Sequence, residues 1–165
     1  MKKYNIGYHV MSIVIVILII CGIVYYLYDK LIVNSDNKTS TNNQIKLVKC
    51  IDGDTAYFTK LNKTRFLFID TPEIYPESEP YGKEAANYTC NLLKKAKVIT
   101  YEYDGNKKDN YNRSLAWIFV DDELLQEKIA QAGYVKAYYD YGNYKYENII
   151  RKSLNDKYNI FEGER

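Results

Sequence analysis

Histidine and tryptophan are almost missing from this chain, which has one of each among 165 residues. The only histidine, His9, lies at the edge of an apolar run near the N-terminus. The remainder of the chain therefore has no imidazole to act as a general base or a metal ligand. Cysteine is scarce too. Outside the apolar run there are only Cys50 and Cys90, and a metal site built on thiolates needs more ligands than these two.

Net charge is also missing from the larger part of the chain. From Ile45 onward the sequence has 19 Lys plus Arg and 19 Asp plus Glu, so the two signs cancel. Balanced charge argues against strong non-specific attraction to a polyanion such as nucleic acid. The lysine-rich stretch Lys94–Lys97 is better explained as a solvated face than as a binding surface. Affinity for phosphate groups therefore has to come from a local site.

One long apolar run is present, over Val10–Leu27, between Lys3 and the next charged residue, Asp29. As a helix this run would be about 27 Å long, close to the thickness of a bilayer core. We therefore expect residues 1–28 to form an uncleaved membrane anchor. The alternative is a cleaved signal peptide, but no Ala-x-Ala-like site follows the run. Lys2 and Lys3 favour the cytoplasmic side, which predicts a main domain outside the cytoplasm, or a secreted one if the segment is cleaved.

The rest of the chain divides into a linker and one domain. Residues 29–44 are rich in Asn, Ser, Thr and Asp, which is typical of a flexible linker. Within residues 45–165, β-branched and aromatic alternation predicts strands over 45–50, 55–61, 65–69, 98–103 and 114–120. Helical spacing predicts helices over 81–96, 124–132 and 144–158, the last with Ile149, Ile150 and Leu154 facing inward. The fold class is therefore α+β, with helices added to a small barrel of five strands.

The two cysteines of the domain are expected to stay unbonded. Cys90 lies two positions from both Tyr88 and Leu92, which belong to the apolar stripe of the helix over 81–96, so it faces away from that stripe. Cys50 lies on a strand. A disulfide between the two is possible outside the cell, but these placements argue against it.

Two short motifs place acids and an arginine beside strand ends. The first is Asp52-Gly53-Asp54-Thr55, and the second runs from Arg65 to Asp70-Thr71-Pro72-Glu73. Each motif alone has an ordinary structural explanation, since Asp-Gly is a common hairpin turn and Thr-Pro-Glu is a common helix start. Together they bring four acids and one arginine to one rim, and this combination suits a hard divalent cation and a phosphate.

With Tyr111-Asn112-Arg113 and Tyr81-Gly-Lys-Glu-Ala85, the two motifs resemble the staphylococcal nuclease-like (thermonuclease) family over roughly residues 45–161. The resemblance implies an OB-fold barrel of five strands carrying three helices. It also implies a Ca²⁺ site formed by Asp54, Asp70 and the backbone carbonyl of Thr71. Carboxylate and carbonyl oxygens are the ligands that this ion prefers.

The resemblance assigns roles to further residues. Glu73 corresponds to the acid that orients or deprotonates the attacking water. Arg65 and Arg113 correspond to the arginines that grip the phosphate, because their planar forks bind its oxygens bidentately. Asp52 corresponds to an acid near the metal that contributes less directly. The tyrosines of the family's nucleotide pocket correspond to Tyr111, Tyr139 and Tyr141.

The expected function is calcium-dependent hydrolysis of phosphodiester bonds in DNA or RNA, leaving 3′-phosphate ends, by a monomeric, membrane-tethered nuclease. Two alternatives stay open: a nucleic-acid-binding barrel without catalysis, and a tethered interaction domain whose acids bind calcium structurally. Two departures from the family's pattern are present. Asn110 replaces the usual lysine, and the 74–80 loop is short and carries Glu77 and Glu79. Both are expected to weaken attraction to phosphate more than the chemical step.

Overall fold

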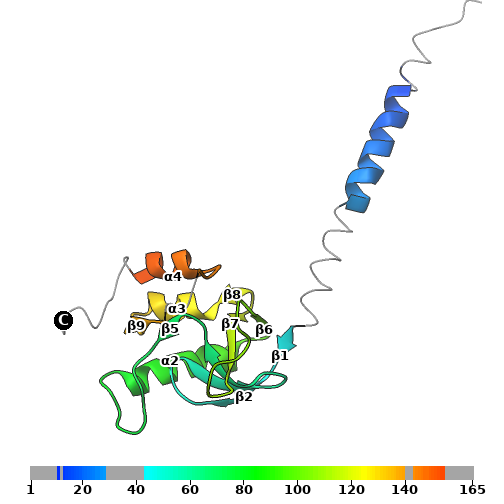
Figure 1. The fold of residues 1–165 in the computed structure, drawn as a ribbon. Helices are drawn as coiled ribbons and strands as arrows, with labels where there is room; N and C mark the ends of the chain where they lie inside the picture. The colour runs from blue at the N-terminus through cyan, green and yellow to red at the C-terminus, as the bar shows by residue number, and fades with distance from the viewer. Residues whose placement is uncertain (1–10, 12, 29–42, 140–142, 155–165) are drawn as a thin grey trace, which may run out of the picture. The chain divides into compact units, whose positions relative to one another are not determined.

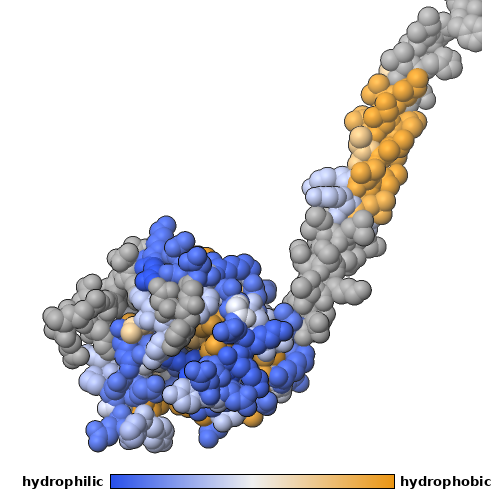
Figure 2. Space-filling view, in the orientation of Figure 1, coloured by the Kyte–Doolittle hydropathy of each residue, from blue (hydrophilic) through white to orange (hydrophobic). Residues whose placement is uncertain are grey.

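The computed structural model describes residues 11, 13–28, 43–139 and 143–154. The chain divides into two compact units, Met1–Asn42 and Asn43–Arg165. In the first, residues 13–28 form a helix whose large apolar side chains are exposed, visible as the orange segment in Figure 2. None of the helices in the described ranges is long and apolar enough to cross a membrane. The transmembrane anchor therefore stays a prediction.

The second unit contains short strands and three helices within its described residues (Figure 1). The strands are β1 (Gln44–Ile45), β2 (Leu47–Cys50), β3 (Thr55–Phe58), β4 (Asn62–Phe66), β5 (Ile69–Asp70), β6 (Ile99–Glu102), β7 (Ser114–Val120), β8 (Glu123–Leu124) and β9 (Ala137–Tyr138). The helices are α2 (Gly82–Lys95), α3 (Leu125–Gln131) and α4 (Glu147–Leu154).

The main sheet is mixed and curls on itself. Its hydrogen-bonded order is β1-β6-β7-β4-β3-β2, β8 adds to β7, and only β4 and β7 run parallel among these pairs in the described chain. The two end strands, β1 and β2, are separated in the chain by Lys46 alone, so both edges of the sheet meet at one residue. A separate pair joins β5 to β9. The α+β class is confirmed. The strand count differs from the five expected, because the strand predicted over 45–50 divides at Lys46 and because β5, β8 and β9 are short additional pairings.

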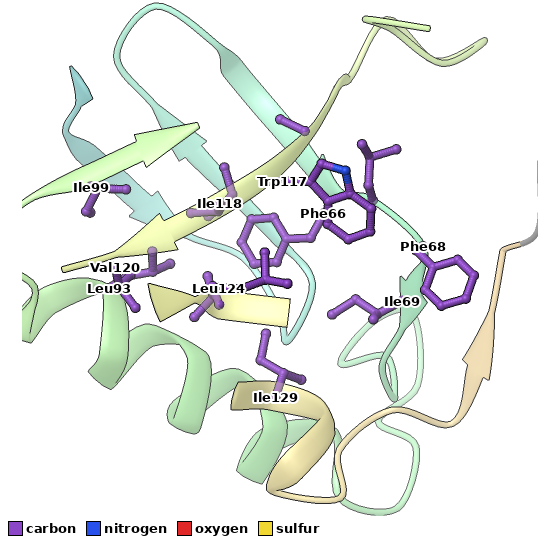
Figure 3. Packing of buried hydrophobic residues seen from close by; sticks show 14 of the residues in the cluster. Phe66, Phe68, Ile69, Leu93, Ile99, Trp117, Ile118, Val120, Leu124 and Ile129 are labelled. Carbon is purple, nitrogen blue, oxygen red and sulfur yellow. The ribbon is translucent and has the colours of Figure 1, made fainter. Parts of the chain in front are cut away.

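The core lies between this curved sheet and the helices (Figure 3). Trp117 and Ile118, on opposite faces of β7, are both fully buried, as is Ile129 of α3. Helix α4 packs against α3 and buries Ile150, whereas Ile149 is 44% exposed, so the prediction that Ile149 faces inward is wrong. A helix this short presents one narrow stripe to its neighbour. The side chain of Leu154 lies outside the described residues.

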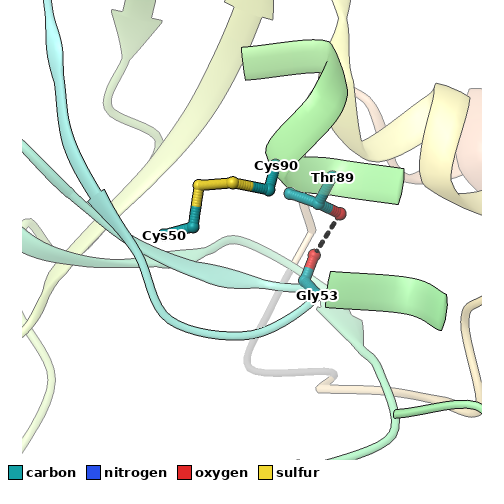
Figure 4. The surroundings of a disulfide bond; sticks show 4 residues. All are labelled: Cys50, Gly53, Thr89 and Cys90. Atoms are coloured by element: carbon teal, nitrogen blue, oxygen red, sulfur yellow. Dashed lines mark hydrogen bonds between the residues drawn. A yellow bond between two sulfur atoms is a disulfide. The ribbon is translucent and has the colours of Figure 1, made fainter. Parts of the chain in front are cut away.

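A disulfide joins Cys50 at the end of β2 to Cys90 of α2, with 5.7 Å between their Cα atoms. The expectation of two unbonded cysteines is therefore wrong. Cys90 lies outside the stripe of α2 that faces the core, but an adjoining face of α2 packs on β2 and the loop after it. Thr89 lies on that side, and its hydroxyl donates a 2.7 Å hydrogen bond to the carbonyl of Gly53 (Figure 4).

Between β4 and β5 the chain bends at Phe68, which is buried and has a left-handed backbone with φ of 72°. This conformation is unfavourable for a bulky residue and needs support from its surroundings. The Phe68 ring stacks on Tyr138 with centroids 4.8 Å apart, and the guanidinium of Arg151 lies 5.0 Å from its centroid. The bend redirects the chain between Arg65 and Asp70, and so decides how these two side chains meet.

Candidate active site

Asp54, Arg65 and Asp70 form a buried cluster where β3, β4 and β5 meet. The guanidinium of Arg65 pairs through Nη1 with Asp54 Oδ1 and through Nη2 with Asp70 Oδ1, the latter at 2.5 Å. The side chain of Arg65 is 7% exposed, that of Asp54 2% and that of Asp70 10%. Burying three charges costs free energy, and their pairing does little more than offset this cost. A contribution to stability therefore does not by itself account for the cluster. Buried and paired charges of this kind are typical of functional sites.

Both oxygens of Asp54 are fixed by hydrogen bonds. Oδ2 accepts from the backbone N–H of Thr71 at 2.7 Å and from its hydroxyl at 3.0 Å, and Oδ1 accepts from the Thr55 hydroxyl at 3.0 Å. Asp52 Oδ1 in turn accepts from the backbone N–H of Asp54 at 3.1 Å. Glycine is needed at position 53, since a Cβ there would lie 2.5 Å from Thr71 Oγ1. The two sequence motifs are therefore one hydrogen-bonded unit.

The chemistry of this unit fits a hard divalent cation. Across the described part of the chain, no group of three or more His, Cys, Asp and Glu side chains is arranged to hold a metal ion. An ion held here would therefore use two carboxylates together with backbone and water oxygens. Asp54 and Asp70 already converge on one cationic group, the Arg65 guanidinium, and Thr71 adjoins both. Oxygen donors of this kind are those that Ca²⁺ takes.

Glu73 lies half-buried, three residues after Asp70. Burial raises the pKa of Glu73, the negative charges of Asp52 and Asp70 raise it further, and the positive charges of Arg65 and Lys136 oppose the rise. Glu73 is thus within electrostatic reach of Arg65 and Asp70. A carboxyl group whose pKa moves toward neutral pH is better matched to accept a proton from water.

Arg113 and Tyr111 form a second group in the segment just before β7. Arg113 directly precedes β7, which runs parallel to β4, the strand that carries Arg65. Its Nε donates to Asp109 Oδ2 at 2.6 Å, and its Cζ lies 5.5 Å from the ring centroid of Tyr111, which is 82% exposed. Burial alone would raise the pKa of Asp109, but hydrogen bonds from the backbone and side chain of Arg113 outweigh it and lower the pKa. Asp109 therefore stays charged and holds the arginine.

Tyr139 belongs with the first group. It follows β9, its backbone N–H donates to the carbonyl of Phe68 at 2.9 Å, and the Cζ of Arg65 lies 5.2 Å from its ring centroid. Tyr139 is 43% exposed, so part of the residue is accessible to a ligand. Tyr141 lies outside the described residues, and its expected role stays a prediction.

Three residues of this region have contacts that were not predicted from the sequence. Asp109 had a usable signal, since it lies four residues before Arg113 with opposite charge. Glu79 was noted only as an added negative charge, and Lys136 had no signal at all. In the structure, Lys136 Nζ donates to Glu79 Oε2 at 2.5 Å and lies 3.6 Å from Asp70 Oδ2. The pairing of β5 with β9 brings Lys136, which directly precedes β9, next to Asp70.

A curved α+β domain with two carboxylates converging on an arginine, a raised-pKa acid beside them and a second arginine just before the next strand is of the class that binds phosphate esters. Comparison of the sequence with known proteins agrees. The family described as "Staphylococcal nuclease homologue" matches residues 63–158. The chain belongs to this family.

Individual relatives match most of the chain. A thermonuclease of Staphylococcus hyicus is 34% identical over 160 residues, covering 93% of this chain and 92% of that protein. A thermonuclease of Staphylococcus intermedius is 34% identical over 165 residues, with the same two coverages of 93% and 92%. Endonuclease YncB of Bacillus subtilis (strain 168) is 35% identical over 138 residues, covering 73% of this chain and 65% of that protein.

Proposed function

We propose that this protein is a nuclease that hydrolyses phosphodiester bonds of DNA or RNA, depends on calcium and leaves 3′-phosphate ends. The observation that carries the proposal is the buried cluster in which Asp54 and Asp70 converge on Arg65 beside the raised-pKa acid Glu73. The names of the relatives support nuclease chemistry. The calcium requirement and the 3′-phosphate products rest on family resemblance.

Ion binding, phosphate binding and activation of the attacking water each have candidate residues. Asp54, Asp70 and the carbonyl of Thr71 would hold the calcium ion, which supplies charge neutralisation at the phosphoryl oxygens when bound. Arg65 and Arg113 bind those oxygens with their planar forks, and their contacts strengthen as negative charge grows on the phosphoryl group. Glu73 holds the attacking water and takes its proton as the water oxygen bonds to phosphorus. The bond between phosphorus and the 5′-oxygen breaks, which leaves the 3′-phosphate, and the 5′-oxygen takes a proton from solvent.

The exposed rings beside the arginines suit the nucleotide. Tyr111 and Tyr139 each lie next to one arginine, so a base or sugar can rest on a ring while the adjoining phosphate meets the guanidinium. Stacking on aromatic rings is tolerant of sequence, which fits a nuclease of broad substrate range. With zero net charge in the domain, these local contacts have to provide the affinity.

One assay separates this function from the two alternatives. The purified full-length chain in mild detergent is incubated with single-stranded DNA and with RNA, each in millimolar Ca²⁺ or in EDTA. Cleavage only with Ca²⁺, absent in Glu73→Gln and kept in Glu77→Gln, is expected. Glu77 is an exposed carboxylate of the adjacent loop, so its variant controls for loss of one negative charge. Binding of nucleic acid without cleavage in any condition would instead identify a binding module. Absence of both binding and cleavage would identify an interaction domain.

We further propose that the domain is tethered to a membrane and lies outside the cytoplasm. The exposed apolar side chains of residues 13–28 support a membrane contact, and the Cys50–Cys90 disulfide suits an oxidising compartment. Protease added to intact cells that make the full chain should remove the domain and leave a small membrane-bound fragment. Cleavage only after lysis would refute the orientation.

A further inference from the structure

Glu79 and Glu73, at the two ends of one loop, are joined by two hydrogen bonds. The backbone N–H of Glu79 donates to the carbonyl of Glu73 at 3.0 Å, and the backbone N–H of Glu73 donates to Glu79 Oε2 at 2.8 Å. These two hydrogen bonds close the 74–80 loop into a ring whose two ends touch. The backbone that carries the Glu73 side chain is therefore fixed by a residue six positions later.

Lys136 anchors this ring to the sheet. The same Oε2 of Glu79 accepts a 2.5 Å hydrogen bond from Lys136 Nζ, which also lies 3.6 Å from Asp70 Oδ2. Lys136 itself is held by a 2.9 Å hydrogen bond from its backbone N–H to the carbonyl of Asp70. Glu73 and Asp70 are thus linked through Glu79 and Lys136, in addition to the short chain between them.

The first residue of α2, Gly82, packs against both residues that close the ring, Glu73 and Glu79. The backbone N–H of Gly82 donates to the carbonyl of Glu79 at 3.0 Å, and a Cβ at position 82 would overlap the carbonyl oxygen of Glu73. Only glycine permits this close approach. The loop is therefore packed between α2 and the Asp70 region, even though its tip residues are exposed.

The charges of the pair agree with this geometry. The hydrogen bond from Lys136 lowers the pKa of Glu79. Burial alone would lower the pKa of Lys136, but its hydrogen bond to Glu79 and the nearby carboxylates raise it. Both groups stay charged at neutral pH. The negative charge of Glu79 is therefore paired with the positive charge of Lys136.

We propose that Glu79 and Lys136 are positioning residues that hold Glu73 at the candidate active site, an inference that rests on the proposed nuclease function. Lys136 fixes Glu79 to the strand of Asp70, and Glu79 fixes the backbone of Glu73. The acid that handles the water is thereby set at a constant place relative to the two carboxylates that converge on Arg65.

Steady-state kinetics on the full chain test the proposal with four variants and a control. Glu79→Ala and Lys136→Met should each lower kcat by about 10- to 100-fold, since small displacements of a catalytic group cost this much. KM should change by less than about threefold, because neither residue contacts substrate. The double variant should be no slower than the slower single one. Glu79→Gln keeps an oxygen that accepts both hydrogen bonds, so it should recover most of kcat, and Glu77→Gln should match the parent.

Three kinetic outcomes would overturn the proposal. A raised KM with unchanged kcat in Lys136→Met would show that Lys136 binds substrate. Multiplying effects in the double variant would show independent roles, and Glu79→Ala behaving as the Glu77→Gln control would show no role.

A separate measurement does not depend on activity. By NMR, hydrogen exchange of the Glu73 amide should accelerate at least about tenfold in Glu79→Ala and stay unchanged in Glu77→Gln. If the parent proves inactive, the nuclease assignment fails while this measurement still decides whether Glu79 holds Glu73. Unchanged exchange in Glu79→Ala refutes the positioning whatever the activity.

Discussion

Loss of the Cys50–Cys90 disulfide should strongly destabilise the domain. The bond joins residues with a sequence separation of 40. For a loop of this length, the chain-entropy treatment gives about 13 cal/mol/K, or about 4 kcal/mol at 25 °C. The unit spans Asn43–Arg165, and an unfolding entropy of about 2.1 cal/mol/K per residue converts this loss to a fall in Tm of about 15 °C.

The measurement is thermal unfolding of the full chain followed by far-UV circular dichroism. The Cys50→Ser/Cys90→Ser double variant should melt about 15 °C below the parent, and parent treated with a reductant should match it. Cys21→Ser is the matched control, since Cys21 is exposed and unbonded in the other unit. It should melt with the parent.

The site should also respond. The disulfide lies next to Thr89, which donates to the carbonyl of Gly53 in the loop that carries Asp54. The double variant should therefore need more Ca²⁺ than the parent to reach half-maximal activity. The predicted loss of stability is refuted if the double variant or the reduced parent melts within about 3 °C of the oxidised parent. A loss of about 4 kcal/mol corresponds to a much larger fall in Tm, about 15 °C.

Three further predictions concern the site. Calcium at a hundredfold excess over its Kd should stabilise the protein by about 2.7 kcal/mol against EDTA, and superimposable melting curves would count against a metal site. Arg113→Lys should fold normally but lose about 10²–10³ in kcat with a smaller change in KM, because lysine keeps the charge and loses the fork; an unchanged kcat would make Arg113 a surface arginine. The pKa of Glu79 is lowered from 4.5, so the ionised group stabilises the fold at neutral pH and this contribution is lost as pH falls below 4.5. The Tm difference between parent and Glu79→Gln should therefore be present at pH 7 and vanish at strongly acidic pH, and a difference constant with pH would refute the ion pair.

The features that were predicted correctly from the sequence depend on local residue patterns. The strand predicted over 114–120 has the same bounds as β7, because its buried apolar residues leave little ambiguity. The acids and arginine of the two motifs do meet, because each lies at a strand end and strand ends share a rim.

What the sequence could not predict depends on contacts between distant segments. Lys136 reaches Asp70 only because β9 pairs with β5, and strands of two residues leave no periodic pattern to detect. Predicting the Cys50–Cys90 bond would have required the knowledge that α2 packs with two faces, one on the core and one on β2. Ile149 was misplaced for a related reason, since the rotation of α4 is set by its contact with α3 and not by its own pattern.

The left-handed bend at Phe68 has a consequence for the order in which the protein is made. The bend lies between Arg65 and Asp70, yet the groups that hold its ring are Tyr138 and Arg151. These two residues follow Phe68 by 70 and 83 positions, so they leave the ribosome after the bend that they support, and a domain folds as a unit during synthesis. The geometry that joins Arg65 to Asp70 is therefore completed only when α4 has been made, so a chain cut short before Arg151 should bear every acid of the site and still lack its final arrangement.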